Sequence, residues 1–357
     1  MEFALSEDQV MLQDSLKGVM AAASPLETVR EVAAGDQSKA ADITYALTEM
    51  GTAGLMIDPA YGGLGLGALE AALTSEILGG LVSPASFIAN AGLAAVAIAA
   101  GGSDDQKAEW LPKIANGEVR FGAALTEAVA RRDGVGVTAK DGALSGTALF
   151  ALEADRATHL LIADTDGGLH IVEAGAASQS PLTTIDKTRT FSEITLDTSP
   201  AVALEHGSIG LEKAITLGRI LLAADTLGAM QTMLDKAVVY AGERKQFGRL
   251  IGSFQAVKHM CAEMAAKLEP CRALVWHAAY TFDTDPDKAA LMACLAKSHL
   301  SEVGTFIART STEVHGGMGF TDLVGLHYWF KRIGVNRQLL GGPEKLRAEA
   351  AALQGWS

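Results

Sequence analysis

The spacing of apolar residues along the chain changes twice. It is helical up to about residue 117, apart from a glycine-rich stretch at 61–67. From about residue 119 it gives way to short runs of β-branched and apolar residues between Gly and Asp turns, at 143–152, 158–163, 169–172 and 194–196. Helical spacing returns at about residue 208. The pattern predicts an α+β protein ordered helices, strands, helices, without the βαβ alternation of a parallel sheet.

Local signals predict where individual helices begin and end in the first helical region. Ser6 with Gln9 three residues later forms a capping box, which predicts a helix to about residue 22. A second helix is predicted over 42–50, where Gly51 is placed to end it. Residues 85–100 are almost uncharged, but the stretch is shorter than the roughly 20 apolar residues of a membrane span. We therefore expect a buried helix there.

The longest helical signal lies in the second helical region. Apolar residues recur there at Phe254, Val257, Cys261, Met264, Leu268, Cys271, Val275 and Ala278. Their spacing alternates between three and four residues, which predicts one helix with a single apolar stripe, kinked at Pro270. The stripe favours a helix packed in a bundle over a coiled coil, whose core positions are bulkier.

Charge and composition exclude several classes of protein. The 357 residues include 29 Lys and Arg and 42 Asp and Glu, a net charge of −13, and 49% are hydrophobic. An acidic chain repels nucleic-acid phosphates and anionic membranes, so we expect neither as a partner. The acidic first ten residues do not resemble a signal peptide, and the three cysteines are an odd number without a CxxC pair. We therefore expect a cytoplasmic protein.

Three generic patterns are too incomplete to assign chemistry. Residues 63–68 satisfy the G-x-G-x-x-A dinucleotide pattern, but a helical run follows where a parallel strand is required. Residues 315–317 are similar to a hydrolase oxyanion loop, but the sequence contains no G-x-S-x-G. The eight histidines show no metal-ligand spacing, so we expect no metal site.

A basic cluster interrupts the acidic background at Arg244, Lys245, Arg249 and Lys258. One interpretation is a solvated helix face with a turn at Gly248. The other is an anion site, in which arginine binds phosphate in a bidentate manner and a neighbouring phenylalanine offers a flat surface to a ring. The residues alone leave both interpretations open.

Two segments near the C-terminus carry a family resemblance. The stretch ERKQFGRLIGSFQAVKHMCAEM at 243–264, followed by EVHGGMGF at 313–320, resembles the acyl-CoA dehydrogenase family in order and spacing. The opening MEFALSEDQ, the loop AYGGLGL and the segment FGAALTE fit the same family. The resemblance therefore covers nearly the whole chain.

The resemblance implies a three-part fold and a flavin cofactor. It implies an N-terminal helical domain at 1–118, a middle β-barrel or sandwich domain at 119–205 and a C-terminal four-helix bundle at 206–357. Family members are FAD-dependent oligomers that desaturate an acyl-CoA thioester: a glutamate removes the α-proton, hydride passes to the flavin, and an electron-transfer flavoprotein accepts the electrons. The flavin ring rests on the β domain of one subunit while a neighbouring subunit holds the ADP half.

The resemblance also implies which residues hold FAD. Arg244, Phe247 and Gln255 match the contacts that a neighbouring subunit makes to the ADP half. Glu313, Gly316 and Gly317 match the glycine-rich loop that closes over it.

The chain departs from the family pattern at the catalytic base. The two positions at which family members carry the glutamate are Gly341 and Gly218 here, and neither can accept a proton. The loop that usually reads T-E-P-x-A-G-S-D around the flavin reads TEAVARRD at 126–133, with two arginines in place of small residues. The catalytic residue of this chain is therefore unknown from sequence.

These departures lead to three hypotheses. The first is a partner subunit, similar to the degenerate chain of heteromeric steroid-type acyl-CoA dehydrogenases, which completes the FAD site of a homologous catalytic subunit. The second is a self-sufficient dehydrogenase with its base moved to Glu344 or Asp225. The third is a flavin monooxygenase or oxidase on the same fold, which needs no carboxylate base.

Overall fold

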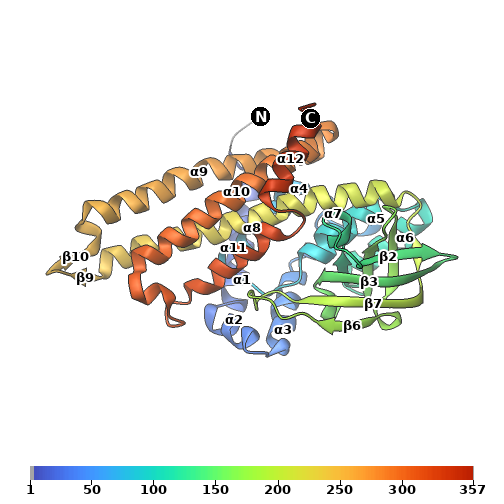
Figure 1. Cartoon of the computed structure of the whole chain (residues 1–357), viewed down its shortest axis with the longest axis horizontal. Coiled ribbons are helices and arrows are strands. Elements are labelled where there is room, and N and C mark those ends of the chain that lie inside the picture. The colour runs from blue at the N-terminus through green and yellow to red at the C-terminus, as the bar shows by residue number, and fades with distance from the viewer. Residues whose placement is uncertain (1–3, 357) are drawn as a thin grey trace.

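Long helices occupy one end of the molecule and a curled sheet the other (Figure 1). The computed structural model describes residues 4–356, so the first three residues of the opening motif and Ser357 lie outside the described part. The order helices, strands, helices is confirmed. The domain boundaries at 118/119 and 205/206 stay a prediction.

The N-terminal part consists of helices packed beneath the long C-terminal ones. They are α1 (Glu7–Ala23), α2 (Leu26–Ala33), α3 (Gln37–Thr48), α4 (Ala68–Gly80), the π-helical segment η3 (Ile88–Ala94), α5 (Ala95–Gly101) and α6 (Asp104–Ala115). The capping box of α1 is confirmed, because Ser6 and Gln9 bond to each other's backbone N–H. The helix predicted at 42–50 begins five residues earlier, because Asp36 caps it by accepting from Ser38 N at 3.1 Å.

The segment at 85–100 is buried, as expected, but it is not one α-helix. It enters as the π-helical segment η3 and continues as α5. Gly92 N donates to Phe87 O at 3.3 Å and Ala95 N donates to Asn90 O, both five residues back. Side-chain spacing does not reveal this widening, because apolar residues cover every face of the segment.

One sheet of eight strands forms the middle of the chain. The strands are β1 (Phe121–Ala124), β2 (Gly136–Lys140), β3 (Ala143–Leu152), β4 (His159–Ala163), β5 (Leu169–Glu173), β6 (Ser178–Pro181), β7 (Phe191–Pro200) and β8 (Val202–Ala203). Their order is β6-β7-β3-β1-β4-β5-β8, β2 pairs with β3, and only β1 and β4 run parallel. Side chains of β1, β2, β3, β4, β5 and β7 share one apolar core, so the sheet encloses a core of its own.

The C-terminal part is built on a layer of long helices. They are α8 (Gly207–Glu243), α9 (Gln255–Thr284), α10 (Pro286–His315), α11 (Leu326–Gln338) and α12 (Pro343–Leu353). The stripe predicted on α9 is buried from Met264 to Ala278 and half-buried before it. Glycine lets α8 approach α4 closely, since a Cβ atom at Gly79 would collide with the carbonyl of Asp225. Within residues 4–356, no helix is long and apolar enough to cross a membrane.

Candidate functional site

A two-stranded hairpin joins α8 to α9 and projects from the end of the helical layer (Figure 1). Its strands, β9 (Lys245–Gln246) and β10 (Arg249–Leu250), are linked by Phe247 and Gly248, both with positive φ. Two consecutive positive φ values suit the tight turn that matches strand twist, and glycine adopts that conformation easily. Phenylalanine does not adopt a positive φ easily. Phe247 does so here although its side chain is 92% exposed. The helical period of the sequence concealed this hairpin, although one of the two interpretations of the basic cluster included a turn at Gly248.

The basic cluster lies on and beside this hairpin. Arg244, Lys245, Arg249 and Lys258 are exposed. Among residues 4–356, none of the four lies within 4.0 Å of a carboxylate. The Arg249 guanidinium instead lies over the Phe254 ring at 3.8 Å from its centroid. Concentrated, unpaired positive charge on an acidic protein suits an anionic ligand.

The glycine-rich loop predicted to hold FAD lies beside the C-terminal end of α8, which leads into the hairpin. The His315 ring stacks on Tyr240 of α8 with their centroids 4.5 Å apart, which joins the ends of α10 and α8. The exposed residue Glu313 and the loop glycines Gly316 and Gly317 adjoin His315. A Cβ atom at either glycine would meet nothing within 4 Å, so their backbone is open to a ligand.

The remaining predicted residue, Gln255, is the exposed first residue of α9. The connection before it returns to the hairpin base, where Ile251 N donates to Arg244 O at 2.8 Å. The structure thus brings the six predicted cofactor residues to one end of the helical layer. Their free guanidinium, exposed ring and open glycine backbone fit the ADP half of FAD.

The space above Gly218 is filled. A Cβ atom there would lie 2.5 Å from Leu340 Cδ1 and 2.7 Å from Leu93 Cδ2. Leu340 is 7% exposed and adopts φ of +53°, a conformation that a leucine rarely takes. The two glycines at the positions predicted for the base are therefore neighbours in space, with Leu340 between them.

The loop carrying Gly341 is held by two buried cations. Arg219 Nε donates to Leu340 O at 3.0 Å, and Lys297 Nζ donates to Gly341 O at 2.7 Å. Arg219 is itself fixed by both carboxylate oxygens of Glu349, at 2.6 and 2.9 Å. The sequence did not reveal Lys297 and Glu349, because each lies on a helix face with no local motif.

Lys297 gives a testable pH dependence. Burial, with repulsion from Arg219 and Arg337, lowers the pKa of Lys297 from 10.5 to about 7. The unfolded chain keeps this proton at a pH where the folded chain has lost it, so the contribution of Lys297 to stability rises with pH above about 7. We expect the free energy of unfolding of the wild type, relative to Lys297→Met, to rise by up to about 1.4 kcal/mol per pH unit from about pH 7 to 9. Urea unfolding at each pH measures it. If the free energies of unfolding of the wild type and of Lys297→Met changed with pH in parallel, the lowered pKa could not be assigned to Lys297.

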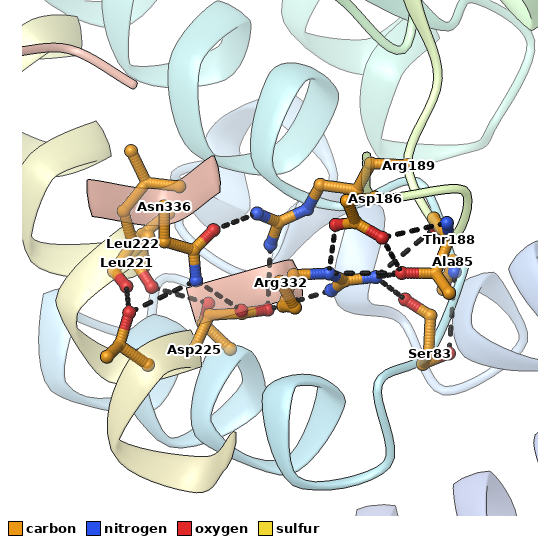
Figure 2. A network of polar contacts seen from close by, with 12 residues as sticks. Ser83, Ala85, Asp186, Thr188, Arg189, Leu221, Leu222, Asp225, Arg332 and Asn336 are labelled. Atoms are coloured by element: carbon orange, nitrogen blue, oxygen red, sulfur yellow. Dashed lines mark hydrogen bonds and ion pairs between the residues drawn. The ribbon is translucent and has the colours of Figure 1, made fainter. Parts of the chain in front are cut away.

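Neither proposed relocated base is free to act in this structure. Asp225 is 1% exposed and is bound by Arg189, Arg332 and Asn336 (Figure 2). Glu344 points to solvent, where it pairs with Arg337 at 3.1 Å. A general base must reach the proton that it abstracts.

The network around Asp225 joins all three parts of the chain (Figure 2). Arg332 of α11 donates to Asp186 Oδ2 at 2.9 Å, to Asp225 Oδ2 at 3.2 Å and to Ser83 O at 3.0 Å. Arg189, from the β6–β7 loop, donates to Asp225 Oδ2 at 2.7 Å. Two buried cations thus meet two buried anions, and the network fixes the β6–β7 loop against α8 and α11.

The TEAVARRD loop, predicted to border the flavin, folds back on itself. It forms a short helix, α7 (Thr126–Val129), and then closes on itself through a 2.9 Å ion pair between Arg132 and Glu127. The Arg132 guanidinium covers the Phe150 ring at 4.9 Å. Val129 Cγ1 would lie 3.5 Å from a Cβ atom at Gly341, so the loop touches the glycine position directly.

Over the described range 4–356, no three His, Cys, Asp or Glu side chains are grouped to hold an ion.

Comparison with known proteins identifies both helical regions. Residues 6–118 match the family profile "Acyl-CoA dehydrogenase, N-terminal domain", and residues 206–352 match "Acyl-CoA dehydrogenase, C-terminal domain". The acyl-CoA dehydrogenase IpdE2 of Mycolicibacterium smegmatis is 27% identical over 345 residues, which cover 96% of this chain and 98% of that protein.

Solved structures extend the likeness to the whole fold. A variant of the steroid ACAD Tcur3481–Tcur3483 superposes with a TM-score of 0.87 at 28% identity, covering 98% of each chain. A structure described as the electron transferring flavoprotein of Acidaminococcus fermentans superposes with a TM-score of 0.88 at 25% identity, covering 99% of each chain.

Proposed function

Because this chain belongs to the acyl-CoA dehydrogenase family of oxidoreductases, we propose that it is a non-catalytic subunit that completes the FAD site of a homologous catalytic subunit. The observation that carries the proposal is the contrast between the two halves of the site. The positions expected to carry the base are glycines closed over by Leu340 and Leu93. Arg244 and Phe247, in contrast, are exposed at the hairpin, and no carboxylate within residues 4–356 pairs with Arg244.

The proposed division of work follows from this contrast. FAD, when bound, supplies the hydride acceptor for desaturation of the acyl-CoA. Arg244 binds the pyrophosphate, Phe247 covers an adjacent ring and Gln255 offers an amide at the start of α9. The open backbone of Gly316 and Gly317 lets the ADP half approach closely. The α-proton leaves to a carboxylate of the catalytic subunit, because neither Gly218 nor Gly341 offers one.

The relatives support the choice of partner and substrate. The steroid ACAD that resembles this chain is named by two components, Tcur3481 and Tcur3483. We therefore propose a heteromer that acts on an acyl-CoA with a bulky, steroid-type acyl group. We further propose that an electron-transfer flavoprotein accepts the electrons, since the second solved structure is described by the name of such a protein.

Expression of the chain alone and with a homologous catalytic subunit tests the proposal. The visible spectrum, the mass in solution and acyl-CoA oxidation are recorded for both preparations. We expect the chain alone to be colourless and the co-expressed pair to be yellow and active. A yellow homo-oligomer that oxidises acyl-CoA would instead support a self-sufficient dehydrogenase. Oxygen consumption with reduced flavin would support a monooxygenase or oxidase.

Replacement of Arg244 tests the cofactor contact. We expect Arg244→Ala to lower the flavin content of the purified complex at least about tenfold, because the pyrophosphate loses a charge-assisted partner. Absorbance ratios of flavin to protein measure the loss. Lys140→Ala, which removes an exposed cation from β2, serves as the matched control and leaves the ratio unchanged. Equal flavin content in both variants would count against Arg244.

A further inference from the structure

A cavity of about 380 Å³ lies where the three parts of the chain meet. Its lining comes from the end of α2, the β6–β7 loop at 185–187 and the start of α11, with Asp322 just before that helix. Within residues 4–356, the lining includes none of the six predicted cofactor residues and neither glycine at a predicted base position. Its use therefore does not depend on the proposed function. A cavity of this size between structural units is typical of a small-molecule site.

Basic side chains outnumber acidic ones in the lining. The charged and titratable residues that line it are Arg30, Lys187, His327 and Lys331, against Asp186 and Asp322. In the part of the chain that the structure describes, neither Lys187 nor Lys331 lies within 4.0 Å of a carboxylate. Lys187 is exposed, and Lys331 is half-buried with its Nζ atom 3.4 Å from a ring nitrogen of His327. Two ammonium groups of this cavity are thus left without an anionic partner.

Arg30 also keeps a donor for a further acceptor. Its Nη2 atom donates to the backbone carbonyls of Asp322 and Leu323, at 2.5 and 3.1 Å. Its Nε atom lies 3.8 Å from Asp322 Oδ2. Its Nη1 atom has no acceptor among residues 4–356 and is not enclosed, since the side chain is 28% exposed.

The two carboxylates of the lining are already engaged. Asp186 is 2% exposed and turns inward, where it accepts from Arg332 at 2.9 Å and from Thr188 N at 2.9 Å (Figure 2). Asp322 is exposed, but Oδ1 lies 2.8 Å from His327 Nε2 and Oδ2 faces Arg30. Arg332 therefore balances one carboxylate and Arg30 the other, which leaves the charge of the two lysines uncompensated.

We propose that this cavity binds a phosphate group, either free phosphate or the phosphate monoester of a small metabolite, between Lys187 and Lys331 with Arg30 at its edge. A dianion matches the two uncompensated ammonium groups, and its oxygens accept charge-assisted hydrogen bonds from lysine and arginine. The net charge of −13 does not prevent this, because salt screens charges that lie more than roughly 8 Å away. A bound phosphate links the β6–β7 loop to α2 and α11.

Calorimetric titration of the full chain with inorganic phosphate, at constant ionic strength, tests the proposal. The wild type and Arg244→Ala are both titrated, so that an anion bound at the hairpin is not mistaken for one in this cavity. We expect saturable binding to both proteins with a Kd of about 1 mM or below. Glucose 6-phosphate, with glucose as its neutral control, distinguishes the two sources. Binding tighter than that of inorganic phosphate indicates a phosphorylated metabolite, and weaker binding indicates free phosphate.

A double variant tests the two lysines. Lys187→Gln/Lys331→Gln is expected to weaken phosphate binding at least about tenfold, because two charge-assisted contacts are lost. Since neither lysine forms an ion pair, the variant is expected to keep its melting temperature. Lys140→Gln/Lys345→Gln is the matched control. It removes the same charge from two exposed lysines outside the cavity and leaves binding unchanged.

A third variant changes the affinity in the opposite direction. Asp322→Asn is expected to tighten phosphate binding, because it removes the exposed carboxylate of the lining and releases Arg30. The proposal is overturned if phosphate does not bind Arg244→Ala by about 10 mM, far weaker than the ordinary range of specific ligands. It is equally overturned if Lys187→Gln/Lys331→Gln binds phosphate as tightly as its matched control, or if Asp322→Asn weakens binding.

Discussion

Replacement of Asp225 by asparagine is expected to lower the free energy of unfolding by about 3–5 kcal/mol. Asp225 is 1% exposed and accepts hydrogen bonds from Arg189 at 2.7 Å and from Arg332 at 3.2 Å. The variant keeps the side-chain shape but leaves two buried guanidinium groups with Asp186 as their only anion in the network. A buried charge without its partner cannot regain the hydration that it lost on folding.

Urea titration measures the effect, with Glu302→Gln as the control. Glu302 also pairs with two arginines, Arg337 at 3.1 Å and Arg347 at 3.6 Å, but all three groups are partly exposed. Its removal is expected to cost less than about 1 kcal/mol. A loss of activity by Asp225→Asn without a loss of stability would contradict the structural role and return Asp225 as a candidate base.

Introduction of glutamate at Gly218 is expected to lower the free energy of unfolding by more than about 4 kcal/mol rather than to create a base. The first added carbon would lie 2.5 Å from Leu340 and 2.7 Å from Leu93, closer than side-chain atoms pack. The carboxylate would then be buried among apolar groups without a partner, and overpacking and desolvation add to each other.

Gly242→Glu is the matched control on the same helix. Gly242 is exposed near the end of α8, and a Cβ atom there would meet nothing within 4 Å. This variant is expected to unfold at the same temperature as the wild type or slightly higher, since glycine disfavours helices. If Gly218→Glu proved as stable as Gly242→Glu, the side chains of Leu340 and Leu93 would have to move aside at little energetic cost. The space above Gly218 could then not be described as closed.

Much of the fold could be predicted from local sequence. The elements that were not predicted were missed for local reasons. The α1 capping box and the α9 stripe were confirmed, since contacts three or four residues apart create both signals. Strand β3 was predicted with its observed bounds, 143–152. The π-helical segment was missed, because that region is apolar on every face. The β9–β10 hairpin was missed because its strands are two residues long.

Some features of the candidate site could likewise be predicted from sequence, and others could not. The sequence by itself determined that the two positions expected to carry the base are glycine, that the loop expected to border the flavin carries two arginines, and that a basic segment surrounds Phe247. Residue identity is sufficient for these statements, because glycine has no proton acceptor in any fold. Only the tertiary structure decided that Leu340 lies between Gly218 and Gly341 and that Asp225 is already bound by two arginines. These are contacts between residues far apart in the chain, and packing rather than local preference decides them.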